Sequence, residues 1–395
     1  MRKNGNMFFG IPHVAVSLPM SAKIPRDMRK GVFRYVKEYG PWVLYLLEGR
    51  TFSQKISDLQ ARGCSGFIGY VETEADAEIL EKMNIPMVLR FLDSGTIPPK
   101  IEAFIRRHST IRTDSPAIGK MAADYYLTTR YEHFAYVGEP NHLGWSLARE
   151  NAFVRRMSEE GRDVFVYQGP QTFSFSEEMP SLCEWLRSLP KRTGVFVVHD
   201  ERARQVLDAS LEAKISLPNE IGILGCDNDA ELCETSFPAI SSVAVDAERA
   251  AYIAMRELDG LMRGKLGRHK IVYGPTQVVV RESTKLEDGQ IDPLVKRALR
   301  LIEINVRNEI TVEKVAQLVS MSRRQLERRF IAAGRLPIHA EINEIKLSRA
   351  QVLLKSSKST LAEIACGLGY SSVSHFCMIY KKRFGATPRQ AAKNG

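Results

Sequence analysis

Short apolar runs alternate with amphipathic stretches along the first 280 residues of the chain. The apolar runs have the length and the Val, Ile and Phe content of strands that are covered on both faces. The expected strands lie at residues 13–18, 42–47, 66–70, 86–90, 110–113, 133–137, 164–167, 194–199 and 221–225. Helical periodicity separates most of them, for example at residues 26–39, 53–62 and 74–83. This alternation predicts βαβ units with parallel sheets, and its length favours two α/β lobes with a cleft between them.

The pattern changes near residue 285. The next residues, Leu286 to Pro293, are polar and include Gly and Pro, which is typical of a linker. Beyond them the strand signals stop and only helical periodicity remains. We therefore expect a two-lobed α/β domain over residues 1–285, a linker over 286–292 and an all-α domain over 293–395.

An internal repeat marks the helical part. Two sets of apolar residues fall at positions i, i+3, i+4 and i+7, and each set predicts one apolar helix face. The sets, 49 residues apart, are Val312, Val315, Ala316 and Val319, and Leu361, Ile364, Ala365 and Leu368. A short turn and a second helix follow each set, which gives two units at about residues 311–332 and 360–384. A long helix over residues 338–355 separates them.

Helix-start signals and inward-facing residues also match between the two units. Ser322 with Gln325, and Thr360 with Glu363, have the spacing of capping boxes. The inward residues of the second helices are Leu326 and Phe330 in one unit and Phe376 and Tyr380 in the other. A helix, a short turn and a second helix form the helix-turn-helix arrangement, whose second helix enters the major groove of DNA.

The outward residues of these second helices are the candidate DNA contacts. They are Arg323, Arg324, Glu327 and Arg328 in the first unit, and Ser374, His375, Met378, Lys381 and Lys382 in the second. Arg324 and Arg328 are four residues apart and share one face. The second unit presents a face with little charge and a basic end that suits phosphate contacts.

The distribution of charge supports a polyanionic partner. Residues 289–395 hold 19 Lys and Arg against 8 Asp and Glu, a net charge of +11, whereas the preceding 288 residues have a net charge of −1. Such asymmetry is expected when a nucleic-acid-binding module follows a neutral domain. A generic helical bundle with a solvated basic surface is the alternative.

Other features exclude several classes of protein. No run of 18 apolar residues occurs, and the N-terminal segment lacks the apolar core of a secretory signal, so we expect a cytoplasmic protein with no membrane contact. The six cysteines form no C-x-x-C pair, so reduced thiols are expected, with no metal and no cofactor.

Two family resemblances follow from these residues. The segment from Thr360 to Gln390, with Gly369-Tyr370, Phe384-Gly385 and Thr387-Pro388, resembles the C-terminal signature of AraC/XylS transcription regulators. The segments 145–153, 199–203, 221–228 and 241–245 resemble the periplasmic-binding-protein-like sensor domain of LacI-type regulators. The order, sensor first and AraC-type domain last, is similar to that of xylose operon regulators.

The resemblance implies a sugar site in the sensor domain. Its expected contacts are Asp227, Arg149, Asp114, Asn228, Asp200 and His199. Several of these residues follow predicted strands, and the carboxyl ends of parallel strands are where α/β sheets bind ligands. For some of them a structural role is open: Asp227 as a helix cap, Arg149 in an interlobe ion pair, and Asp114 as a helix start. Val245 stands where related sensors often have a polar residue, which leaves the ligand open.

These observations predict a DNA-binding transcription regulator. The resemblance implies an activator of a carbohydrate-catabolism operon that is controlled by a monosaccharide such as a pentose. Double-stranded operator DNA, RNA polymerase and a second copy of the chain are the expected partners. A non-sugar effector such as a nucleoside is one alternative. The other is a sugar-modifying enzyme that uses paired carboxylates such as Asp200 and Glu201. No nucleophile elbow, metal motif or phosphate loop accompanies those acids in the sequence, so we expect no enzyme.

Overall fold

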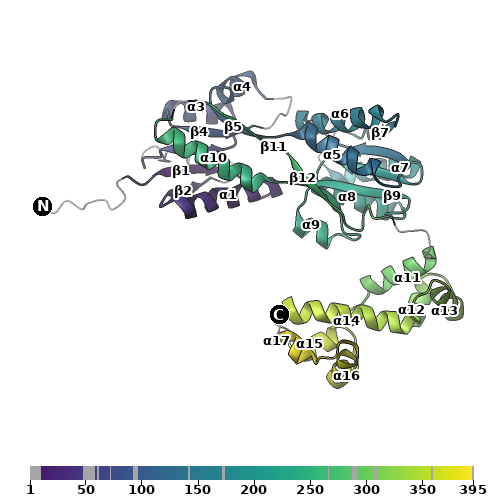
Figure 1. Ribbon diagram of the computed structural model, residues 1–395. Helices are drawn as coiled ribbons and strands as arrows, with labels where there is room; N and C mark the ends of the chain where they lie inside the picture. The colour runs from purple at the N-terminus through teal and green to yellow at the C-terminus, as the bar shows by residue number, and fades with distance from the viewer. Residues whose placement is uncertain are drawn as a thin grey trace. The chain divides into compact units, whose positions relative to one another are not determined.

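The chain forms two compact units, residues 1–286 and 287–395, in a computed structural model (Figure 1). The structure describes residues 10–47, 58–59, 62–71, 73–91, 97–140, 143–170, 174–265, 267–286, 292–306, 310–356 and 359–393. Most of the helix expected over 53–62 and of the linker expected over 286–292 lies outside these residues. Among the described helices, none is long and apolar enough to cross a membrane.

Two six-stranded sheets build the first unit. The first sheet has the order β11-β5-β4-β3-β1-β2 and is parallel throughout. Its strands are β1 (His13–Ser17), β2 (Val43–Leu46), β3 (Gly66–Gly69), β4 (Met87–Arg90), β5 (Ser109–Thr113) and β11 (Lys270–Tyr273). The second sheet has the order β12-β10-β9-β8-β6-β7, and only β12 is antiparallel to its neighbour. Its strands are β6 (His133–Val137), β7 (Val164–Val166), β8 (Thr193–Val197), β9 (Ile221–Asp227), β10 (Ser241–Val245) and β12 (Pro275–Val279).

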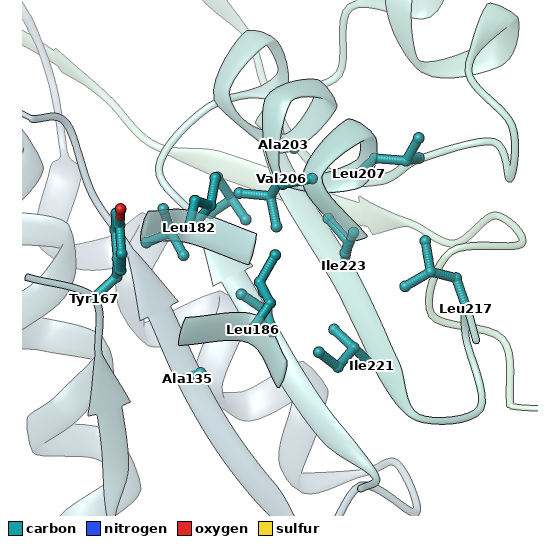
Figure 2. Close-up of a cluster of buried hydrophobic side chains, with 14 of the residues drawn as sticks. Ala135, Tyr167, Leu182, Leu186, Ala203, Val206, Leu207, Leu217, Ile221 and Ile223 are labelled. Carbon is teal, nitrogen blue, oxygen red and sulfur yellow. The ribbon is translucent and has the colours of Figure 1, made fainter. Parts of the chain in front are cut away.

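Helices cover both faces of each sheet, so each lobe has two cores. The helices are α1 (Lys23–Tyr39), α3 (Glu74–Met83), α4 (Pro99–Ile105), α5 (Ser115–Leu127), α6 (Gly144–Glu159), α7 (Phe175–Ser188), α8 (Asp200–Glu212), α9 (Ala230–Thr235) and α10 (Ala247–Met262). Successive residues of a strand point to opposite faces. Val195 therefore belongs to the core under α7 and α8, and Phe196 to the core on the other face. Figure 2 shows the first of these cores, where Leu182 and Val206 lie near Ile223.

The chain passes between the lobes three times, after β5, after β10 and between β11 and β12. The helix α10 packs against α1 in the first lobe, and α5 packs against α6 in the second. The predicted two-lobed α/β architecture is confirmed. Two predicted strand ends are wrong by two residues: the strand expected over 194–199 stops at Val197, and the one expected over 221–225 continues to Asp227. The other predicted ends lie within one residue of the observed ones.

The second unit is entirely helical over its described residues. It contains α11 (Pro293–Ile304), α12 (Val312–Leu318), α13 (Arg323–Ala332), α14 (Ile338–Ser356), α15 (Leu361–Gly367), α16 (Val373–Phe384) and α17 (Pro388–Lys393). Both predicted capping boxes are present, at Ser322 and at Thr360. The turns inside the two helix pairs reach positive φ at Ser320 (57°) and at Gly369 (66°).

The helix α14 serves both helix pairs. Ile338 and Ile342, near its start, join the core formed by α11, α12 and α13. Leu347, Ala350 and Leu354, further along, join the core of α15 and α16. One helix therefore fixes the spacing of the two helix-turn-helix units, as the sequence predicts for residues 338–355.

The contact between α5 and α6 depends on Gly119. A Cβ atom at this position would lie 2.2 Å from the backbone oxygen of Arg149, far inside the van der Waals distance. We expect Gly119→Ala to push the two helices apart, to lower the free energy of unfolding of the first unit by about 1–3 kcal/mol, and to displace Arg149. Urea denaturation followed by fluorescence measures this change.

Gly260→Ala is the matched control. Gly260 lies in α10, and the nearest atom to its added Cβ is Cδ of the flexible Lys265 side chain at 3.2 Å. This change should leave stability unaltered or raise it, because Ala favours the helix over Gly. Equal destabilisation by the two substitutions would contradict the role of Gly119.

Candidate ligand site and DNA-binding surface

A cavity of about 430 Å³ lies in the first unit, where carboxyl ends of strands from both sheets meet. The first lobe contributes residues at the ends of β3, β4 and β5, and the second lobe contributes residues at the ends of β8 and β9. Cavities of about 300–1,000 Å³ with a few convergent polar groups are typical of small-ligand sites. Five of the six predicted ligand residues line this cavity: Asp114, Arg149, His199, Asp200 and Asp227.

Arg149 projects from α6 and is 5% exposed. Its Nη1 donates to the backbone oxygen of Val198, and its Nη2 lies 4.0 Å from Oδ1 of Asp227. The guanidinium also lies 5.0 Å from the centre of the Trp145 ring. Its Nε has no acceptor within the described structure, so a polar ligand can provide one. Arg149 and Asp227 both belong to the second lobe, so their contact is not an interlobe ion pair.

Asp227 ends β9 in a strained conformation, with φ of 99°. The buried carboxylate of Asp200 holds the turn that follows: it accepts from the Asp229 amide at 2.7 Å and from the Ser242 hydroxyl at 2.6 Å. Burial, and secondarily the charge of Asp227, raise the pKa of Asp200 to about 7. Asp200 therefore positions its neighbours and is largely removed from solvent. Asp227 itself caps no helix, because α9 begins after Asp229.

His199 is the N-cap of α8 rather than the end of a strand. Its Nδ1 accepts from the Arg202 amide at 3.1 Å, which leaves the ring proton on Nε2 to donate to Glu139. Burial raises the pKa of Glu139, but the hydrogen bond from His199 and the charges of Arg202 and Arg149 outweigh this and hold the pKa below its usual value. The His199 ring lies 6.1 Å from that of Trp145. These contacts fix the wall of the cavity in the second lobe.

Asp114 and Asn228 have structural partners. Asp114 is the N-cap of α5 and accepts from the Ala117 amide at 3.0 Å, so the helix-start alternative is present alongside a place in the cavity lining. Asn228 is outside the lining residues. Its side-chain oxygen accepts from Arg281 at 2.9 Å, which directs this amide away from ligand binding and toward the support of the turn.

Other lining residues carry chemistry that the sequence analysis did not assign. Tyr70 follows β3, Arg90 ends β4, and Trp145 begins α6. Asp229 also lines the cavity and pairs with Arg26 of α1, which joins the second lobe to the first. Tyr70 and Arg90 stand at the carboxyl ends of predicted strands. The rule that selected Asp227, a polar residue at the carboxyl end of a parallel strand, selects Tyr70 and Arg90 too.

The predicted DNA contacts are solvent-accessible on α13 and α16. Every one of the nine is exposed except Glu327, which is half-buried. The Arg323 guanidinium pairs with Glu313 at 2.7 Å. No acidic group among the described residues lies within 4.0 Å of Arg324 or Arg328, so both are available to an external anion. Met378 of α16 is 63% exposed.

A two-lobed α/β unit with a cavity and a repeated helix-turn-helix are the parts of a ligand-responsive transcription regulator.

Comparisons with known proteins agree with this class. Residues 105–284 match the periplasmic binding protein-like domain family, and residues 315–394 match a helix-turn-helix domain family. The chain is 34% identical over 375 residues to the Xylose operon regulatory protein of Haemophilus influenzae, a match that covers 93% of this chain and 95% of that protein. It is 29% identical over 371 residues to the Xylose operon regulatory protein of Escherichia coli (strain K12), with 92% and 93% covered.

A solved structure extends the similarity to three dimensions. The structure of the xylose-binding transcription activator XylR matches with a TM-score of 0.73 and 27% identity, over 98% of this chain and 100% of that one. The chain belongs to the AraC-type transcription regulators that carry a periplasmic-binding-protein-like sensor domain, the family of the xylose operon regulatory proteins. These relatives confirm the prediction of a regulator rather than an enzyme.

The raised pKa of Asp200 makes the stability of the first unit depend on pH. Its folded pKa of about 7 lies above the ordinary value of 3.8, so the folded state binds the proton more tightly than the unfolded state. The stabilisation that protonated Asp200 gives the folded state is complete below about pH 4, falls as the pH rises toward 7 and is lost above pH 7. We expect the Tm of Asp200→Asn, relative to that of the wild type, to rise between pH 5 and pH 8.

Thermal melts of both proteins at the two pH values measure the effect. About 1 kcal/mol corresponds to roughly 2–4 °C in a unit of this size. Asp208→Asn is the control, because Asp208 lies on the same helix and pairs with Arg204 at the surface. A pH-independent difference between wild type and Asp200→Asn would show that Asp200 stays ionised in the folded protein.

Proposed function

We propose that this protein activates transcription of a carbohydrate-catabolism operon when a monosaccharide, such as a pentose, binds in the cavity between its lobes. The observation that carries the proposal is the similarity to xylose operon regulatory proteins along both units, from the sensor domain to the helix-turn-helix repeat. The proposed ligand contacts are Arg149, Asp227 and Asp114, with Asp200 and His199 as positioning residues.

The chemistry of the cavity supports a sugar. Asp227 offers carboxylate oxygens that accept from adjacent hydroxyls, and Arg149 offers donors from a planar guanidinium. The Trp145 ring supplies an apolar face with a polar edge, which suits the mixed surface of a sugar ring. Because these three side chains contact or approach one another, a single small ligand can engage them together.

In the proposed mechanism, the ligand changes the balance between open and closed arrangements of the two lobes. The ligand can do so only if it binds one arrangement more tightly than the other. A closed arrangement is favoured by contacts from both lobes, and Arg26 of α1 with Asp229 of the second lobe is one such contact. The chain acts as a homodimer, and two pairs of reading helices bind half-sites of an operator near RNA polymerase.

Removal of the Asp227 carboxylate tests the ligand site. We expect Asp227→Ala to lower sugar affinity by at least about 100-fold, because the loss leaves ligand hydroxyls without an acceptor and Arg149 without its ion-pair partner in a buried site. Calorimetry with pentoses, hexoses and nucleosides measures affinity, and operator binding without ligand checks that the variant is folded.

Glu184→Ala, an exposed change on α7, is the control and should bind sugar like the wild type. Unchanged sugar affinity in Asp227→Ala would remove that residue from the site. Binding of a nucleoside in place of every sugar would overturn the proposed class of effector.

Substitution on α13 tests the reading helix. We expect Arg324→Ala or Arg328→Ala to weaken binding to the specific operator by about 1–3 kcal/mol and to relax one base position. Electrophoretic mobility shifts with a set of single-base operator variants measure both effects. Arg349→Ala removes an equal charge from the exposed side of α14 and should weaken binding equally for all sequences or leave it unchanged. If the α13 variants behaved like Arg349→Ala, their role in base reading would be wrong.

A further inference from the structure

The two reading helices carry different chemistry at equivalent positions. The inward residues Phe330 of α13 and Tyr380 of α16 are 50 residues apart, and the same offset pairs Arg328 with Met378. Met378 is 63% exposed, whereas Tyr380 is 1% exposed. Where the first helix presents a guanidinium to solvent, the second therefore presents a thioether.

The orientation of α16 is fixed by its packing. Phe376 and Tyr380 are buried in the core that α16 shares with α14 and α15. At the end of the helix, Nε of Arg383 donates to Oε1 of Glu344 on α14 at 2.7 Å. These contacts prevent rotation of α16 about its axis, so the residues on its opposite side stay outward.

Met378 lies in the middle of that outward side. Residues four apart share a helix face, so Ser374, Met378 and Lys382 form one row, with His375 and Lys381 beside it. All five side chains are exposed. No acidic group among the described residues lies within 4.0 Å of either lysine, so both are available to DNA phosphates. The centre of the face is apolar and its end is basic.

A thioether can recognise few features of a base pair. It has no hydrogen to donate and accepts only weakly, but it is flexible, polarisable and apolar. In the major groove, guanine, adenine and cytosine present polar groups, whereas thymine also presents an apolar C5 methyl group. A single exposed Met elsewhere on a surface needs no explanation. At the centre of a reading face, its chemical match is the thymine methyl group.

We propose that Met378 packs against the C5 methyl group of a thymine in the half-site bound by α16, while Lys381 and Lys382 bind the adjacent phosphates. This inference rests on the proposed operator binding and adds the base that the second unit selects. Arg328 of the first unit has the geometry for guanine, which accepts two parallel hydrogen bonds from a guanidinium. The two units of one chain then select different bases, and the order of the bases fixes the direction in which the chain binds.

Replacement of thymine by deoxyuridine tests the contact, because it removes the methyl group and keeps the base pair. Full-length protein first enriches its preferred DNA from a randomised pool, with D-xylose absent or present. Each thymine of that DNA is then replaced in turn, and fluorescence anisotropy measures affinity. We expect deoxyuridine at one or two adjacent positions to weaken binding by about three- to fivefold, the effect of one buried methyl group.

Substitution of Met378 assigns the effect to this side chain. Met378→Ala should weaken binding to the thymine DNA by about three- to tenfold and remove the further loss caused by deoxyuridine at those positions, because coupled groups are not additive. Met378→Leu keeps an apolar contact and should keep the preference for thymine. Met20→Ala, which removes a 49% exposed Met from the first unit, is the control and should bind both DNAs like the wild type.

Salt dependence separates base contact from phosphate contact. Met378→Ala should leave the slope of log affinity against log salt concentration unchanged, because no charge is lost. Lys382→Ala should reduce that slope by about one and weaken all sequences alike.

The outcomes separate this inference from the proposed function. If deoxyuridine replaces every thymine without loss, or if Met378→Ala keeps the full deoxyuridine effect at every position, thymine reading by Met378 is ruled out and operator binding stands. If Met378→Ala alters dimerisation in analytical ultracentrifugation and leaves base preference intact, Met378 belongs to a protein contact instead. If the chain enriches no sequence from the pool, sequence-specific operator binding fails and this inference fails with it.

Discussion

Burial of both faces of a parallel sheet is the constraint on which the first unit depends. Each strand must be apolar on both sides, each strand must return through a helix, and every such return places a loop at the carboxyl end of a strand. In β8, Val195 faces one core and Phe196 the other. The two sheets leave their polar residues at the strand ends, and the ends from both lobes meet at the cavity. The site is thus a product of the same rule that forms the cores.

In the second unit, the corresponding constraint is that the two helix pairs share the helix α14. A helix pair has too few apolar residues to form a stable core alone, and α14 completes the cores of both pairs. Lys346, in the middle of α14, is buried, donates to the Gly369 oxygen at 3.2 Å and lies 5.3 Å from the centre of the Tyr370 ring. This contact ties α14 to the turn between α15 and α16. The position of one reading helix therefore depends on a buried residue of α14.

The sequence predicted the parts of the molecule whose signals are local. The two-lobed class, the capping boxes and the inward pairs Leu326–Phe330 and Phe376–Tyr380 are all present, because periodicity and caps are properties of short segments. The edge strands β11 and β12 were not predicted. Their side chains are largely exposed and mixed in polarity, so they carry no buried-strand pattern.

Site residues were harder to predict, because long-range partners decide what a polar side chain does. Asn228 follows β9 like Asp227, yet Arg281, 53 residues later, engages its amide. The rule that selected Asp227 applies equally to Arg90, which ends an apolar strand at the cavity. Arg90 donates to three neutral acceptors, and no carboxylate among the residues that the structure describes pairs with it. A charge balance of this kind exists only in three dimensions.

The three passages between the lobes have a consequence for the order in which the chain is made. Most of the second lobe, from α5 to β10, is inserted within the first, and α10 and β11 complete the first lobe only afterwards. During synthesis, β1 to β5 leave the ribosome without α10, which covers part of their apolar surface through Ala250, Ala254 and Leu258. The first lobe therefore stays incomplete, with part of its apolar surface exposed, until residues 247–273 emerge from the ribosome. Apolar surface exposed in this way is prone to aggregation, and the speed of translation sets how long the exposure lasts.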